Sequence, residues 1–191
     1  MKKRNARDFA CLSHTLTPRN RSGQVWIETV IYTLIAFVMI ALVLSYARPK
    51  IQELQDRAIL QQSTDMLKQI SSTLSTMNGA GNQRILEIGV KAGTLNIDAV
   101  TDRIIFQLES QSLYSEPDKS INDGDVIVLT QKKSGYNLVT LTRDYSSDYD
   151  LKFEGKDEVK VISKSSNSYK LIIINNGANS NGKTIMNMSL S

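Results

Sequence analysis

The spacing of hydrophobic residues changes along the chain, and these changes define three segments. Residues 25–47 are apolar on every side of a helix and carry a single charge, Glu28. From Ile51 to Met77, apolar residues recur every three or four positions, which predicts an amphipathic helix. From residue 84 onward, short runs of β-branched and aliphatic residues are separated by turn signals, which predicts strands.

The first two segments predict one continuous helix from Gln24 to Met77, because no glycine interrupts this range. A helix of that length extends roughly 80 Å. Pro49 lies inside it and removes one hydrogen bond, so we expect a kink there rather than an end. The glycines within residues 78–82 favour the left-handed conformation that closes a helix. The second half presents an apolar stripe that we expect to pack on a sheet face: Ile51, Leu54, Ala58, Met66, Ile70, Leu74 and Met77.

The remaining residues predict about nine short strands in a sandwich or small barrel. The fold class is therefore α+β, with a long N-terminal helix (a transmembrane half and an amphipathic half) followed by an antiparallel β-sandwich in residues 79–191. Serine- and asparagine-rich residues 163–168 and 175–181 are interpreted as loops. The expected strands cover residues 85–88, 94–97, 104–108, 125–129, 136–141, 151–153, 159–162, 169–174 and 184–188, with turns at Asn122-Asp123-Gly124, Ser134-Gly135, Asn176-Gly177 and Asn181-Gly182.

The apolar run has the length of a membrane span. Thr29–Ala47 comprises nineteen residues without a charge, or about 28 Å of helix, close to the hydrocarbon thickness of a bilayer. Trp26 and Tyr46 lie near its two ends, where amphipathic rings favour the membrane interface. The alternative is a core helix, but nothing downstream is apolar enough to surround it. A secretory signal peptide has a shorter apolar region and a cleavage site after it.

The excess of positive charge, the single cysteine and the single histidine all lie in the first 23 residues. Residues 1–23 hold six basic residues and Asp8, a net charge of +5, whereas the rest holds 17 basic and 18 acidic residues, or −1. The positive-inside rule then places the N-terminus in the cytoplasm and the β body outside. Such a body shows no basic excess for nucleic acid. Cys11 and His14 are the sole cysteine and histidine, so without residues 1–23 the chain lacks thiol and imidazole chemistry, and we expect no enzyme, cofactor or metal.

The residues Arg21-Ser22-Gly23-Gln24-Val25-Trp26-Ile27-Glu28 carry a resemblance. They resemble the class III signal peptide of type IV pilin-like proteins, most closely the archaeal form. That family has a basic leader, a small residue before the cut, Gln as the first mature residue and Glu as the fifth. Counted from Gln24, Glu28 is the fifth residue.

The resemblance implies a processing and assembly pathway. A membrane prepilin peptidase would cut between Gly23 and Gln24 and remove residues 1–23 as a cytoplasmic leader. Residues 24–78 would then anchor the subunit in the membrane and later pack with copies of itself or related pilins in an extracellular homo- or hetero-polymer. A polytopic membrane platform and its ATPase would drive this assembly at the cell surface.

Glu28 gives this interpretation a physical basis. A carboxylate among apolar residues is costly in hydrocarbon unless it is paired or neutralised. Cleavage after Gly23 creates an α-amine at Gln24, which can pair with the Glu28 of the same or a neighbouring subunit. The alternative is an interfacial glutamate at a helix N-terminus, stabilised by the helix dipole without a partner.

Other candidates have simpler explanations. Asp118, Asn122, Asp123 and Asp125 lack the spacing of a calcium loop, so a turn between strands is the simpler interpretation. The same holds for the second acidic cluster of Asp144, Asp148, Asp150 and Glu154, where a cation site with oxygen ligands alone stays open as an alternative. Asn187 begins a glycosylation sequon in a segment expected to face outside. Besides the filament subunit, one further class remains open: a single-pass anchored β-sandwich that binds a ligand or mediates adhesion and does not polymerise. A membrane-anchored enzyme is disfavoured because residues 24–191 contain neither His nor Cys.

Overall fold

The computed structural model describes residues 22–111 and 113–191, with side chains from residue 25 onward. Helix α1 runs from Ser22 to Thr76 and contains Pro49. Its bounds lie close to those predicted, and the chain leaves the helix through Gly79, whose φ of 89° is left-handed. The chain divides into two compact units between Tyr46 and Ala47. The second half of α1, from Ala47 onward, therefore belongs to the same unit as the sheets.

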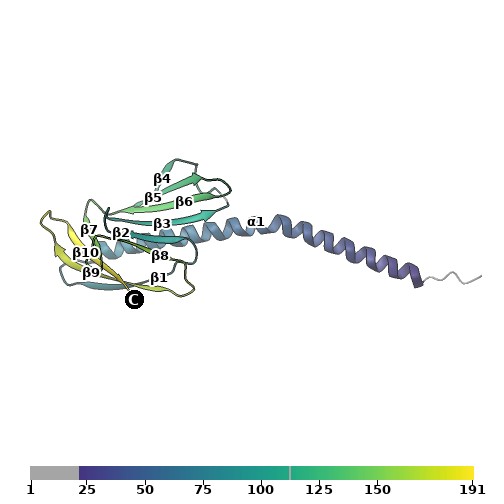
Figure 1. The fold of residues 1–191 in the computed structure, drawn as a ribbon, viewed down its shortest axis with the longest axis horizontal. Helices are drawn as coiled ribbons and strands as arrows, with labels where there is room; N and C mark the ends of the chain where they lie inside the picture. The colour runs from purple at the N-terminus through teal and green to yellow at the C-terminus, as the bar shows by residue number, and fades with distance from the viewer. Residues whose placement is uncertain (1–21, 112) are drawn as a thin grey trace, which may run out of the picture. The chain divides into compact units, whose positions relative to one another are not determined.

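The described residues after α1 form strands in two sheets (Figure 1). The order in the four-stranded sheet is β1-β9-β10-β7, and in the six-stranded sheet it is β4-β5-β6-β3-β2-β8. The α+β class is confirmed. The strands are β1 (Gln83–Ile88), β2 (Thr94–Asp98), β3 (Arg103–Ser110), β4 (Ser120–Asp123), β5 (Val126–Lys132), β6 (Asn137–Asp144), β7 (Tyr149–Phe153), β8 (Val159–Ser163), β9 (Tyr169–Ala178) and β10 (Thr184–Leu190).

One strand pair departs from the predicted antiparallel arrangement. β7 and β10 pair in parallel, with Leu151 opposite Met186 and Phe153 opposite Met188. Parallel neighbours require a long crossover connection. Here the connection consists of β8 in the six-stranded sheet and β9 in the four-stranded one, so the chain visits both layers before it returns beside β7.

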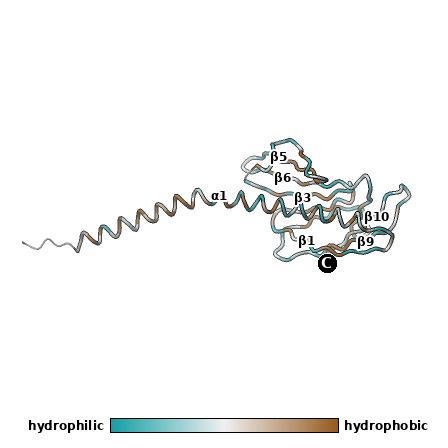
Figure 2. Tube along the Cα trace, turned by 180° about the vertical axis from the view of Figure 1, so that it is seen from behind, coloured by the Kyte–Doolittle hydropathy of each residue, from teal (hydrophilic) through white to brown (hydrophobic). Residues whose placement is uncertain are grey.

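The second half of α1 lies between the two sheets, as the views from both sides show (Figures 1 and 2). The predicted stripe is correct from Met66, which is partly buried against the core, to Met77, and wrong at its beginning. Ile51, Leu54 and Ala58 are exposed. The buried face instead begins at Asp56 and includes two further polar residues, Ser63 and Thr64. The other buried residues of this face have the same helical spacing and are apolar: Leu60, Leu67, Ile70, Leu74 and Met77.

Two predicted turns differ from those in the structure. Residues 120–123 form β4, so the turn expected at Asn122-Asp123-Gly124 comes later, at Gly124 and Asp125, where Gly124 adopts a φ of 62°. β9 continues through Asn176 and Gly177, where a turn was expected, and Gly177 adopts a φ of 88° within the strand. In β9, pairing with the neighbouring strands overrides the local turn preference. The turns at Ser134-Gly135 and Asn181-Gly182 are confirmed, because both lie between consecutive strands.

Candidate functional site

The first half of α1 exposes a continuous apolar surface. The large hydrophobic side chains from Val25 to Tyr46 are all exposed. No residue in the most apolar stretch of the helix is buried. Figure 2 shows the hydrophobic colour along this part of the helix. Among the described residues, α1 is the one helix long and apolar enough to cross a membrane. This segment is therefore a candidate membrane anchor, and its exposure differs from that of a core helix.

The serine and threonine hydroxyl groups of this segment are bonded within the helix itself. Thr29 Oγ1 donates to the carbonyl oxygen of Val25 at 2.9 Å, and Ser45 Oγ donates to that of Leu42 at 2.9 Å. Thr33 Oγ1 donates in the same way to the carbonyl oxygen of Thr29. Because hydrocarbon offers no hydrogen-bond partners, such internal bonds lower the cost of placing hydroxyl groups in lipid.

Glu28 is the charged residue on this surface. Its side chain is exposed, and within the described part of the chain it makes no ion pair. The backbone of Gly23 and Gln24 is helical, so Gln24 and Glu28 lie one turn apart on the same helix face. Trp26 and Tyr46 are 76% and 74% exposed. They are separated by about 30 Å of helix, as expected for rings at the two interfaces.

A polar contact joins the second half of α1 to the six-stranded sheet. Ser71 Oγ lies 2.9 Å from the hydroxyl oxygen of Tyr145 and accepts a hydrogen bond from Arg143 Nε at 3.1 Å. The Arg143 guanidinium also lies 4.9 Å from the centre of the Tyr145 ring. Burial raises the pKa of Tyr145 to about 12, so this phenol remains protonated across the physiological range. The contact fixes the rotation of the helix against the sheet.

Two further contacts lie toward the ends of the buried half. Ser110 Oγ donates to Asp56 Oδ2 at 2.6 Å, where the six-stranded sheet meets the beginning of the buried stripe. Asn175 Nδ2, in β9, donates to the carbonyl oxygen of Met77 at 2.8 Å and satisfies a group at the helix end. The helix is thereby bonded to both sheets.

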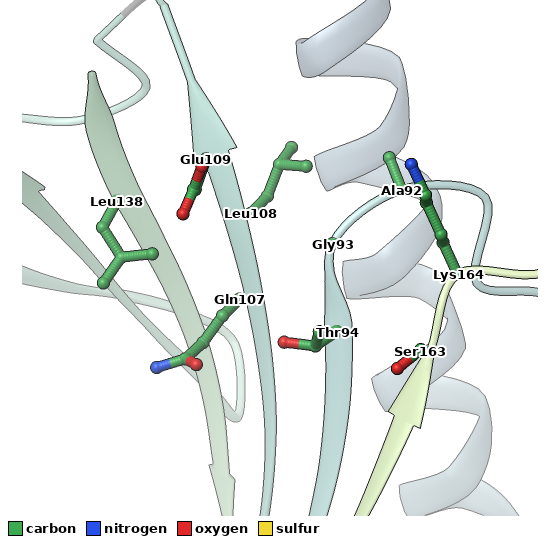
Figure 3. Close-up of a pocket in the computed structure, with 9 residues that line it drawn as sticks. All are labelled: Ala92, Gly93, Thr94, Gln107, Leu108, Glu109, Leu138, Ser163 and Lys164. Carbon is green, nitrogen blue, oxygen red and sulfur yellow. The ribbon is translucent and has the colours of Figure 1, made fainter. Parts of the chain in front are cut away.

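A hollow of about 480 Å³ opens on the body. Figure 3 shows the hydroxyl groups of Thr94 and Ser163, on β2 and β8, directed toward the strand that carries Gln107. A side chain at Gly93 would fill part of this region and collide with the backbone, because its Cβ would lie 2.2 Å from the Gln107 carbonyl oxygen. The lining combines neutral polar groups with one carboxylate and one ammonium: Ala92, Gly93, Thr94, Gln107, Leu108, Glu109, Leu138, Ser163 and Lys164.

Of the two predicted acidic clusters, Asp125 and Asp148 line one hollow of about 380 Å³ together with Arg143 and Tyr145. Asp123 and Asp125 pair with Lys68 and Arg143 at 3.0 and 3.5 Å. The described residues contain no group of three carboxylate, imidazole or thiol side chains that could hold a metal. Asn187 lies in β10, where its Oδ1 accepts a hydrogen bond from the backbone N–H of Gly155 at 2.7 Å. Cys11 and His14 lie outside the described residues.

Sequence reasoning missed the residues that attach the helix to the body. Asp56 and Ser71 are polar, so a search for apolar residues passes over them. Their spacing of three, four or a multiple of these from Leu60, Leu67 and Leu74 was the available signal. Comparison with known proteins adds no identification: no protein-family model, curated protein or solved structure matches the chain.

Proposed function

We propose that this chain is a structural subunit of an extracellular type IV pilus-type filament, held in the membrane by its N-terminal helix before assembly. The observation that carries the proposal is the exposed apolar half of α1 with one carboxylate, Glu28, near its beginning. An apolar surface of this size is stable in lipid or against other such helices, but not in water. The sequence around Gly23 and Gln24 supplies a processing site on the N-terminal side of this surface.

In this function, each end of the mature helix has a defined task. The α-amine of Gln24 pairs with a Glu28 carboxylate in the dry filament core, because the pair costs less there than either charge alone. Residues 25–47 exchange lipid for neighbouring helices, and Pro49 permits a change of direction near the membrane surface. The β body then forms the filament exterior.

The test is expression in a host that supplies a prepilin peptidase, an assembly platform and its ATPase, followed by shearing of the cells. Sheared filaments whose protein begins at Gln24 support the proposal. N-terminal sequencing that starts after Ala47, or still at Met1, contradicts it. Glu28→Ala should prevent filament formation and leave cleavage intact, whereas Gly23→Phe should leave the leader attached.

Glu53→Ala is the matched control for Glu28→Ala. Glu53 lies on the same helix but outside the apolar half, and its carboxylate pairs with Lys50 and Arg57 at 2.9 Å. Exposed ion pairs of this kind contribute little to stability. We therefore expect Glu53→Ala to form filaments. Equal loss of filaments in both variants would show that Glu28 has no special role.

The hollow beside Gly93 favours a second candidate, an anchored β-sandwich that binds a ligand and does not polymerise. Thr94 and Gln107 offer uncharged donors and acceptors there, as small-molecule sites do. In this case sheared cells would release no filament, and the processed chain would stay in the membrane fraction. Ser163→Trp would then abolish attachment of cells to a surface, while a filament subunit would retain its yield of sheared material.

A further inference from the structure

The six-stranded sheet ends in two short strands with an open edge. In the described part of the chain, β4 pairs with β5 alone and β8 pairs with β2 alone. The outward N–H and C=O groups of an edge strand can pair with a strand from another chain. Proteins usually prevent this with charges or a covering segment, so the side chains at each edge decide what it accepts.

Both edges expose apolar side chains. On β8, Val159 and Val161 are 52% and 55% exposed, and Val100, just after the neighbouring β2, is also exposed. On the opposite edge, Ile121 in β4 and Leu113 before it are exposed. Each edge thus offers apolar area that an added strand would remove from water.

The charges of the two edges are opposite. Residues 159–168 contain Lys160 and Lys164 and no acidic residue, and Lys91 lines a shared surface hollow with Lys164. Residues 113–123 contain three acidic residues and Lys119, a net charge of −2. Lys119 pairs with Glu116 at 2.9 Å, which leaves Asp118 without an ion pair in the described residues. Like charges therefore oppose β8 with β8 and β4 with β4, whereas unlike charges favour β4 with β8.

The direction of the pairing follows from where the charges lie. Antiparallel strands bring Asp118, before β4, toward Lys164, after β8. They also bring Asp123, which pairs with Lys68 at 3.0 Å within its own chain, toward Lys160. Glu158, before β8, then lies near Asp125, whose carboxylate is already paired with Arg143 at 3.5 Å. Parallel strands would instead place Asp118 and Glu116 beside Glu158, where like charges repel.

We propose that β4 of one copy pairs antiparallel with β8 of the next copy. The contact joins two different surfaces, so each copy keeps one free edge, and repetition produces an open chain rather than a closed dimer. The inference rests on the proposed function, because the membrane helices are what gather the bodies side by side. It adds a contact between the bodies that the helix alone does not supply.

The experiment uses the full chain with Cys11→Ser, so that every thiol is introduced. One tagged copy carries Ser120→Cys and a second carries Ser163→Cys, both at exposed positions. A thiol cross-linker that spans about two residues of strand, roughly 7 Å, is added to membranes and to sheared material. Antiparallel pairing brings these two residues together, so we expect a mixed dimer in about tenfold excess over the dimers of either variant alone.

Val159→Cys is the matched control for Ser163→Cys, because it lies at the other end of the same five-residue strand. In the antiparallel arrangement it is about 13 Å farther from Ser120, beyond the reach of the linker. Equal cross-linking of Ser120→Cys with either partner, or no mixed dimer in sheared filaments, would overturn the proposal.

Reversal of the charges on both edges tests the same contact without introduced cysteines or a cross-linker. Lys91→Glu with Lys164→Glu should reduce filament yield several-fold, and Glu116→Lys with Asp118→Lys in the same chain should restore it. Lys132→Glu with Lys133→Glu, at the exposed end of β5 and the first residue after it, is the control and should change little. Failure of the compensating pair to restore the yield, with the sheets folded by circular dichroism, counts against the contact.

The outcomes separate this contact from the filament proposal. Filaments without the mixed dimer would retain the proposed function and remove the β4–β8 contact. The mixed dimer in membranes, with no filament released by shearing, would retain the contact and remove the filament. Absence of both would remove both.

Discussion

The two halves of α1 belong to one uninterrupted helix but meet opposite environments. From Val25 to Tyr46 the side chains are apolar on all sides and exposed. In the second half, Asp56, Ser63 and Thr64 are buried although they are polar. Hydrophobicity alone therefore does not determine burial within this chain. A helix face is buried where the sheets fit it, and an entirely apolar helix must find its surroundings outside the chain.

The largest difference between the halves should appear in truncation of leucine. Leu67 is fully buried, so Leu67→Ala should lower the free energy of unfolding of the body by about 2–5 kcal/mol. Leu42 is exposed, and Leu42→Ala should leave that free energy unchanged. Urea unfolding of the full chain in detergent, followed by the β-sheet signal in circular dichroism, measures both. Equal losses would contradict the division of the helix.

An arginine should impair membrane insertion when it is placed in the first half of α1 and have no effect on insertion when it is placed in the second half. Val38→Arg places a charge in the middle of the apolar half. It should make the free energy of membrane insertion less favourable by about 2.5–3.5 kcal/mol. Gln61→Arg, on an exposed position of the second half, should leave insertion unchanged. Alkaline extraction of membranes measures how much of each variant stays inserted. Full retention of Val38→Arg would exclude a span centred there.

The Tyr145 hydroxyl should make the buried half sensitive to alkali. Burial raises its pKa from 10.0 to about 12, so between these values the unfolded chain loses a proton that the folded chain keeps. The free energy of unfolding should therefore fall as the pH rises through this window, by up to about 3 kcal/mol. Below pH 10 the phenol is protonated in the folded and the unfolded chain, so the full stabilisation by the protonated Tyr145 is present.

Tyr145→Phe sharpens this prediction, because it removes both the titration and the hydrogen bond to Ser71. We expect a loss of about 1 kcal/mol at neutral pH and a shallower decline above pH 10. Tyr136→Phe, in the half-buried end of a hairpin, is the control and should keep the full alkaline decline. Urea titrations at several alkaline pH values compare the three chains. An unchanged slope in Tyr145→Phe would assign the decline to other groups.

The smallest effect should come from Leu54, which separates the predicted stripe from the observed one. Leu54 is 67% exposed, so Leu54→Gln should change the free energy of unfolding by less than about 0.5 kcal/mol. A loss of more than about 1 kcal/mol, the ordinary cost of a core change, would place the beginning of the packed stripe earlier than Asp56. The same urea titration in detergent provides the measurement.

The long helix and most strands were predictable because their signals are local. A run without glycine, an apolar stretch of membrane length and alternating β-branched residues each depend on neighbours in the sequence. β4 was missed because Asn122 and Asp123 resemble a turn, and its pairing partner β5 supplies the backbone bonds that make it a strand. The candidate segment around Glu28 was found from sequence, whereas the hollow beside Gly93 was not, because its lining comes from strands distant in sequence.

The sequence by itself determined where the chain is helical, where it is too apolar for water, and where its one charge lies in that segment. The tertiary structure alone decided which residues of the second half are buried, since Asp56 and Ser71 acquire their partners from Ser110, Tyr145 and Arg143. It also decided that β7 and β10 run parallel. The physical reason is that hydrophobicity is a property of each residue, whereas hydrogen-bond partners and strand neighbours exist only once distant segments meet.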